Sequence, residues 1–244
     1  MSGYKLTYKR FGERSILIEW PPEINENVLY DVLNYKESIV KSSIKSIIEV
    51  KSAYNSILIN YINAIDNIND AFLILKALYK PSKSSKQKEA VLWRIPVCYD
   101  TKFAIDLEDL ALSKKCSIDD IIQWHSNDIY TIYFIGFLPG FYYLGGLDKK
   151  LHHPRRSSPR LQIKKGAVGI GGNQTGVYPN VSPGGWNIIG NSPIHFFDVN
   201  LQEPCFAKQG DKIKFESVSL KEYNDIKTLV EAGVYHIKQE PIND

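Results

Sequence analysis

The distribution of glycine and proline constrains the fold of this chain more than any other feature. Of 16 glycines, 12 lie between Gly136 and Gly190, and of 12 prolines, 6 lie between Pro139 and Pro193. Both residues interrupt helices and mark turns, so the segment favours short strands joined by turns. Regularly spaced short strands are typical of a β-sandwich or a closed barrel, and here we expect a barrel. We expect its strands at residues 129–137, 161–164, 168–171, 186–189 and 212–215.

Residues before and after this segment alternate between helix and strand patterns. Two short helices are expected at 106–114 and 117–125, the second with Ser117 as its N-cap, and a terminal helix at 219–232. Nearer the N-terminus we expect a strand at 14–20, a helix at 25–38, a hairpin at 44–54 and 56–61, a helix at 65–79, and a possible last strand at 91–97. That order is the split βαβ, ferredoxin-like arrangement.

A Pro-, Ser- and Lys-rich stretch at residues 80–90 has the composition of an exposed linker. We therefore predict two domains. A small α+β, ferredoxin-like domain covers residues 1–85, and a β-barrel domain with a C-terminal helix covers residues 90–244.

Composition excludes several classes of protein. The chain has 244 residues, 43% hydrophobic, and a formal charge of +3, without the basic stripe of a nucleic-acid-binding domain. Residues 1–10 lack the apolar core of a signal peptide, and the longest uncharged stretch, 166–197, is too rich in Gly, Pro and Asn for a membrane helix. We expect a cytoplasmic protein with neither a nucleic acid nor a membrane as partner.

A basic segment occupies residues 149–165, with seven Lys or Arg residues and no acid. Pro154 and Pro159 stiffen it. Arginine binds carboxylates and phosphates bidentately, so Arg155, Arg156 and Arg160 are candidates for anion or substrate binding. The alternative is a solvated basic loop.

The glycine-rich stretch 166–176 matches neither a P-loop nor a dinucleotide-binding fingerprint. Its glycines fit barrel turns and bulges. Uncharged polar side chains nevertheless gather there, and Gln174, Thr175 and Tyr178 are candidates for orienting a small amide or carboxylate.

Aromatic side chains are interleaved with glycine at residues 136–146. One interpretation is packing in the barrel core. The other is an exposed patch for a protein partner, formed by Phe137, Phe141, Tyr143 and Trp186.

Among five histidines, none has metal-ligand spacing, so no metal is expected. His125, at the end of a predicted helix, is the candidate general acid or base, although a histidine there also serves as a partner of the helix dipole. No GxSxG motif surrounds a serine, which argues against a self-contained hydrolase.

Long motifs in the second half resemble the family of KipI and of the B subunit of 5-oxoprolinase (PxpB), also called allophanate hydrolase subunit 1. Order and spacing match over about residues 95–193. The motifs are Ile95-Pro96-Val97-Cys98-Tyr99-Asp100, His125, Gly136-Phe137-Leu138-Pro139-Gly140-Phe141, Tyr143-Leu144-Gly145-Gly146, Pro154-Arg155, Pro159-Arg160, Gly172, Gln174-Thr175-Gly176, Tyr178-Pro179, Ser182-Pro183-Gly184-Gly185-Trp186 and Gly190. Asn191 stands where the family often has Arg, and Ala167 where it often has Ser.

The resemblance implies a small α/β domain followed by a cyclophilin-like β-barrel. It also implies a chain that works in a complex with an A subunit, and with a larger, KipA-like C subunit. Together they open the lactam of 5-oxo-L-proline to L-glutamate with ATP hydrolysis, and this chain is not expected to be active alone. ATP belongs to the complex, and the substrate class is a small amide or lactam.

Two alternatives remain open. Some members of the family inhibit a sporulation histidine kinase, so the chain could bind such a kinase through its aromatic patch. Related domains also occur in urea carboxylase, which suggests a component of a urea carboxylase or allophanate hydrolase-type complex. If the chain is part of the enzyme, we expect the three arginines, Gln174, Tyr178 and His125 to line one pocket.

Overall fold

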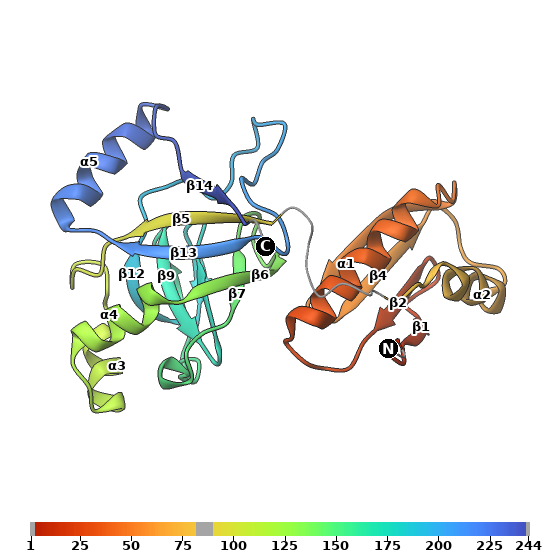
Figure 1. Cartoon of the computed structure of the whole chain (residues 1–244), viewed down its shortest axis with the longest axis horizontal. Helices are drawn as coiled ribbons and strands as arrows, with labels where there is room; N and C mark the ends of the chain where they lie inside the picture. Colours follow the sequence, from red (N-terminus) through yellow and green to blue (C-terminus); the bar gives the residue numbers. More distant parts are fainter. Residues whose placement is uncertain (1–2, 82–89, 243–244) are drawn as a thin grey trace. The chain divides into compact units, whose positions relative to one another are not determined.

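The computed structural model describes residues 3–81 and 90–242 of the chain. It divides into two compact units, Met1–Lys88 and Glu89–Asp244 (Figure 1). Most of the predicted linker, residues 82–89, lies outside the described residues.

The first unit is a four-stranded antiparallel sheet with helices packed on it. The sheet has the order β1-β2-β4-β3, and helix α1 lies along one of its faces (Figure 1). Asn25 and Asn67 cap the two helices with their side chains, as expected for helix starts. The elements are β1 (Thr7–Arg10), β2 (Ser15–Glu19), α1 (Glu26–Lys41), β3 (Ile47–Ala53), β4 (Ser56–Tyr61) and α2 (Ile68–Leu78).

Alternation along the two central strands places the core on the helix side. In β2 and β4 every second side chain is buried, namely Ile16, Ile18, Ile57, Ile59 and Tyr61. A buried polar group lies in the same core: the Asp31 carboxylate accepts hydrogen bonds from Trp20 Nε1 and from the Tyr79 hydroxyl, both at 2.7 Å.

The prediction that residues 91–97 complete the first sheet is wrong. These residues form β5 (Val91–Val97) in the second unit, where they pair in parallel with β13 (Lys212–Ser217) over six residues. The edge position of the first sheet is taken by β1, which the sequence patterns did not indicate. In the second sheet β5 lies between β13 and β14, and it pairs with both of them.

The second unit contains an eight-stranded sheet of order β12-β9-β10-β7-β6-β13-β5-β14 (Figure 1). At one point the sheet curls back on itself: Cys98, directly after β5, and Asn191 of β12 exchange two backbone hydrogen bonds of 2.9 Å. Within the described residues the two edge strands, β12 and β14, do not pair with each other, so the barrel is not closed. The remaining strands are β6 (Ile129–Ile135), β7 (Tyr142–Gly145), β9 (Ala167–Gly171), β10 (Gln174–Val177), β12 (Asn187–Asn191) and β14 (Lys238–Pro241), with β8 (Arg160–Ile163) and β11 (Ser182–Gly184) as a separate pair.

Helices flank this sheet as the sequence predicts. Ser117 and Asp120 form a capping box at the start of α4, and Ser219 and Glu222 form another at the start of α5. Helix α4 packs on β13. The helices are α3 (Leu107–Lys114), α4 (Ile118–Asn127), the 3₁₀ turn η1 (Lys149–Leu151) and α5 (Leu220–Glu231).

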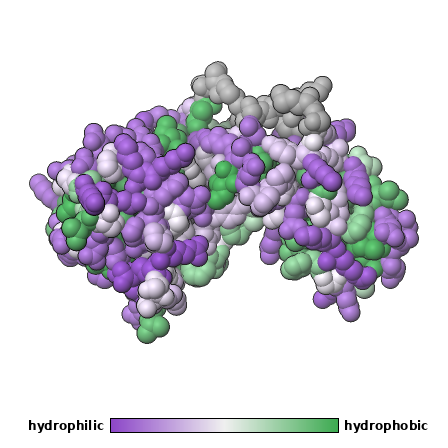
Figure 2. Space-filling view, turned by 90° about the horizontal axis from the view of Figure 1, so that it is seen from below, coloured by the Kyte–Doolittle hydropathy of each residue, from purple (hydrophilic) through white to green (hydrophobic). Residues whose placement is uncertain are grey.

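The surface of the molecule is largely hydrophilic on the face that Figure 2 shows. Figure 2 shows hydrophilic side chains over most of the visible face, with separate apolar patches among them. Among the described helices, none combines the length and the apolarity that a bilayer crossing requires.

Candidate functional site

Glycines of β9 and β10 make room for the indole ring of Trp186. Gly169 and Gly176 lie opposite each other on the two strands, and Gly171 lies at the end of β9. A Cβ on Gly171 would lie 2.4 Å from the indole Nε1, and one on Gly176 would lie 3.0 Å from the ring. These three glycines therefore provide a flat sheet surface for an aromatic side chain, rather than a cradle for a phosphate.

An aromatic cluster surrounds Trp186 on this face. The Phe141 ring lies edge-on to Trp186 at 5.5 Å and edge-on to Tyr178 at 5.0 Å, and Tyr143 packs beside it at 4.7 Å. Phe141 and Trp186 are 1% and 4% exposed, so in the isolated chain their rings are not accessible to a partner. Of the four predicted interface residues, Tyr143 is half-buried and Phe137 is 60% exposed.

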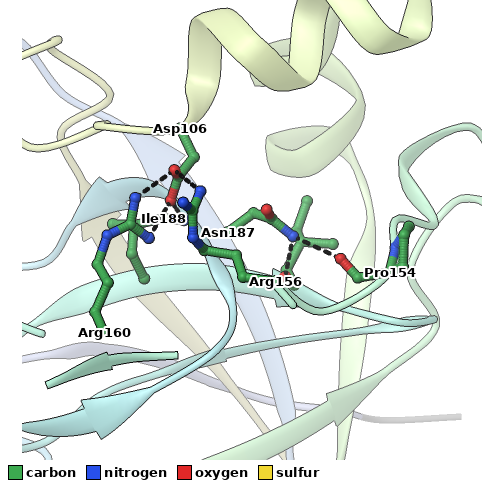
Figure 3. A network of polar contacts seen from close by, with 7 residues as sticks. Asp106, Pro154, Arg156, Arg160, Asn187 and Ile188 are labelled. Carbon is green, nitrogen blue, oxygen red and sulfur yellow. Dashed lines mark hydrogen bonds and ion pairs between the residues drawn. The ribbon is translucent and has the colours of Figure 1, made fainter. Parts of the chain in front are cut away.

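Arg155 extends this cluster to the surface. Its guanidinium lies 5.8 Å from the centre of the Trp186 ring, which is cation–π distance. Over the described ranges, no carboxylate lies within ion-pair distance of Arg155. The loop that carries it is fixed, because Asn187 Nδ2 donates to the Pro154 and Ile170 carbonyls at 2.9 and 3.2 Å (Figure 3).

The other two arginines of the basic segment meet a buried acid. Arg160 donates to both oxygens of Asp106, at 2.6 and 2.9 Å, and Arg156 donates to Oδ1 at 2.9 Å (Figure 3). The backbone N–H of Ile188 adds a fourth hydrogen bond, of 2.7 Å, to this carboxylate. Asp106 is 3% exposed. Arg156 and Arg160 therefore hold the basic loop and β8 against α3 and β12, whereas Arg155 is exposed and has no carboxylate in ion-pair distance within the described residues.

Asp106 was not identified as a site residue from the sequence. It precedes α3, where an acid is ordinarily a helix-start residue, and its arginine partners are 50 and 54 positions away. The sequence feature that points to Asp106 is the basic segment, which contains no acid. An arginine of this segment that becomes partly buried needs an acidic partner from another part of the chain.

His125 lies on the opposite, core side of the sheet. It is fully buried and stacks on Phe215 at 4.6 Å. Nδ1 is 2.7 Å from the Tyr99 hydroxyl, and Nε2 is 2.8 Å from the Thr175 hydroxyl. Burial lowers the pKa of His125 to about 3, so the ring is neutral at pH 7.

Hydrogen bonding assigns the tautomer of this histidine. The Thr175 hydroxyl donates its one hydrogen to the Gly169 carbonyl, at 3.1 Å, and therefore accepts from His125 Nε2–H. Nδ1 then accepts the Tyr99 O–H. A histidine with both nitrogens used and no contact with solvent is a structural element of the core.

We expected His125 to line one pocket with the three arginines, Gln174 and Tyr178, and for His125 this expectation is wrong. Successive side chains of a strand point to opposite faces, so Thr175 points to His125, whereas its neighbour Gly176 lies under Trp186. Gln174 is buried, next to Thr175 in β10. Residues 3–81 and 90–242 contain no group of three His, Cys, Asp or Glu side chains that could hold a metal ion.

Comparison with known proteins gives the family. Residues 6–207 match the family model for the carboxyltransferase domain, subdomain C and D. The chain is 34% identical to the B subunit of 5-oxoprolinase from Bacillus subtilis over 239 residues, which cover 90% of this chain and 95% of the relative.

Two solved structures share the fold. The crystal structure of TTHA0988 has a TM-score of 0.73 at 26% identity and covers 84% of this chain, which spans 40% of that chain. The urea amidolyase of K. lactis has a TM-score of 0.83 at 19% identity over 98% of this chain, which spans 16% of it, so that likeness concerns the fold alone. The family match and the nearly full-length Bacillus subtilis relative together show that this chain belongs to the family of the 5-oxoprolinase B subunit.

Proposed function

We propose that this chain is the B subunit of an ATP-dependent 5-oxoprolinase that opens 5-oxo-L-proline to L-glutamate together with the A and C subunits. The observation that carries the proposal is the match to the Bacillus subtilis relative over 95% of that protein's length. A match of that extent involves the whole relative rather than one shared domain.

Within the complex, this chain binds an anionic group and does not supply a complete set of catalytic residues. His125 is neutral, buried and doubly hydrogen-bonded, so it is not available as an acid or base. Opening a lactam requires stabilisation of the charge that develops on its carbonyl, and ATP supplies the driving force at the level of the complex. Arg155 is an exposed cation with no carboxylate partner among the described residues, and it is suited to a phosphate.

The loop between β6 and β7 is proposed as a contact for a partner subunit. Leu138 N–H donates to the Gly136 carbonyl at 2.8 Å, which closes a three-residue turn on Phe137, and Phe137 has φ +63°. That conformation costs a bulky residue about 1–3 kcal/mol. The strained turn holds an exposed aromatic ring outward, 5.6 Å from Phe141, as an interface anchor requires.

We also propose a ferredoxin-like fold for residues 1–85 and a cyclophilin-like barrel for residues 90–244. The two compact units and the hydrogen bonds between Cys98 and Asn191 support this division and a barrel-like curvature. A cytoplasmic location is part of the same proposal, because an ATP-dependent enzyme needs the ATP of that compartment.

Omission of single subunits tests the function. This chain is purified with the A and C subunits of the same complex, and ADP release is measured with and without 5-oxo-L-proline while each subunit is left out in turn. Turnover in the full mixture alone is expected. A folded, complete mixture that is inert on 5-oxoproline contradicts the proposal and leads to the same assay with urea-like amides and to kinase-binding measurements.

A further inference from the structure

A pocket of about 110 Å³ lies beside the Asp106 network, on the surface of the second unit. Its floor is buried and largely apolar, whereas its exposed rim carries polar side chains together with Ile105, which is 56% exposed. Lys102 and Lys164 lie on this rim. The pocket is lined by Lys102, Phe103, Ile105, Gln162, Ile163, Lys164, Ala167, Ile188 and Asn191.

The floor offers little for a polar group. Ile163, Ala167 and Ile188 are buried and supply apolar surface. Asn191 is buried as well, but its amide is already used: Nδ2 donates to the Lys165 carbonyl at 2.9 Å, and Oδ1 accepts from the Tyr223 hydroxyl at 2.7 Å. The inner end of a ligand must therefore be apolar.

The rim favours an anion. Within the part of the chain that the structure describes, neither Lys102 nor Lys164 has a carboxylate in ion-pair distance; the Lys102 ammonium lies 5.8 Å from the Phe103 ring. Asp100 accepts from the Lys102 backbone N–H at 2.9 Å. Asp106, next to Ile105, is compensated by two arginines and does not repel an anion. Positive charge therefore exceeds negative charge around the opening.

We propose that this pocket binds a small carboxylate with a compact ring, the ring on the apolar floor and the carboxylate between Lys102 and Lys164. At about 110 Å³ the pocket is somewhat smaller than the roughly 150 Å³ apolar cavity that accommodates benzene, so a five-membered ring fits. Gln162 adds a donor and an acceptor at the rim, which complement the edge of a lactam. Identification of the ligand as 5-oxo-L-proline rests on the proposed function, whereas the carboxylate class rests on the pocket.

Methyl NMR of the full-length chain tests the binding. The δ1 methyl groups of isoleucine are ¹³C-labelled, the signals of Ile163 and Ile188 are assigned, and three probes are titrated: cyclopentanecarboxylate, its neutral amide, and 5-oxo-L-proline. We expect both signals to shift with the two carboxylates and not with the amide. No shift at millimolar carboxylate, or equal binding of the amide, overturns the proposal.

Lysine variants locate the anion contact. The double variant Lys102→Gln/Lys164→Gln is expected to weaken carboxylate binding by about tenfold or more, as a lost charge-assisted contact does. Lys165→Gln is the matched control, because Lys165 is exposed, adjacent in sequence and absent from the lining. Equal affinities for the double variant and the control contradict the assignment.

The NMR titration and the activity assay together distinguish a failure of the pocket proposal from a failure of the proposed function. If the assembled complex does not act on 5-oxoproline but cyclopentanecarboxylate still shifts the two methyl signals in a lysine-dependent way, the pocket stands and the substrate is another carboxylate. If the complex opens 5-oxoproline and neither carboxylate shifts the signals, the function stands and the pocket proposal is wrong.

Discussion

The guanidinium of Arg160 donates two hydrogen bonds to the buried carboxylate of Asp106, at 2.6 and 2.9 Å. This pair joins β8 to the start of α3, and Arg156 joins the same carboxylate from the basic loop. Two arginines of the most basic segment therefore stabilise the fold through a buried carboxylate. Within this segment, the positive charges that we propose for ligand binding are those of Arg155 and Lys164.

Replacing Asp106 by Asn is expected to lower the free energy of unfolding by about 2 kcal/mol or more, because two arginines lose their charged acceptor. Denaturant unfolding measures the change. Asp225→Asn, on the exposed side of α5, removes the same charge and should stay within about 0.5 kcal/mol of wild type. Equal stability of the two variants would show that the Asp106 network is not stabilising.

Adding one methyl group under Trp186 tests the packing of the glycine face. Gly171→Ala places a Cβ 2.4 Å from the indole Nε1, so the ring or the strand must shift. We expect a loss of about 1–3 kcal/mol and a change in tryptophan fluorescence. Gly185→Ala is the control, because its Cβ would meet no atom closer than 3.7 Å. If both alanine variants unfold at the same denaturant concentration, Trp186 does not lie against Gly171.

Burial of His125 predicts a specific pH dependence of stability. Its pKa in the folded chain, about 3, lies below the ordinary value of about 6.5. Between these values the unfolded chain binds a proton that the folded chain does not, so stability falls as pH falls, by up to about 1.4 kcal/mol per pH unit. His153 and His195, whose pKa values burial also lowers, contribute in the same direction.

The imidazole ¹⁵N chemical shifts of His125 measure this without a substitution. We expect a neutral ring protonated on Nε2 from pH 7 down to pH 4.5. An imidazolium signal for His125 at pH 6 would contradict its assignment to the core.

Removing the ring of Phe137 separates strain from recognition. Phe137→Gly relieves the positive φ, whereas Phe137→Ala retains it, so the glycine variant should be the more stable of the two by about 1 kcal/mol. Both should weaken assembly with the partner subunits, as measured by co-purification. Undiminished assembly in both variants would exclude Phe137 as a partner contact.

Arg155→Ala is expected to reduce the activity of the assembled complex, with an increase in the KM for ATP if the guanidinium binds a phosphate. Lys149→Ala, which removes one exposed charge from η1, is the control. Kinetics indistinguishable from the control would remove Arg155 from the binding site.

Local patterns predicted much of the fold. The capping residue Ser117 and the hairpin around Asn55 are both found, since caps and turns depend on neighbouring residues. The partner of residues 91–97 was not predicted, because they pair with β13, a strand that is distant in the sequence.

The sequence patterns did not predict how the candidate site residues are arranged on the sheet. Arg155, Tyr178 and Trp186 do lie on one face of the second unit, with Arg155 stacked on the Trp186 ring. His125 and Thr175 lie on the other, because the faces of β10 alternate with each residue. A sequence pattern places residues near one another along a strand, but which face each one takes depends on the register of the sheet.

The most direct test of the proposed role in the enzyme is L-glutamate formation from 5-oxo-L-proline and ATP, with this chain titrated into fixed amounts of the A and C subunits. The account predicts no glutamate without the chain and a rate that rises with its concentration and then saturates. A rate that does not depend on the chain would contradict the claim that it is a required component of the enzyme.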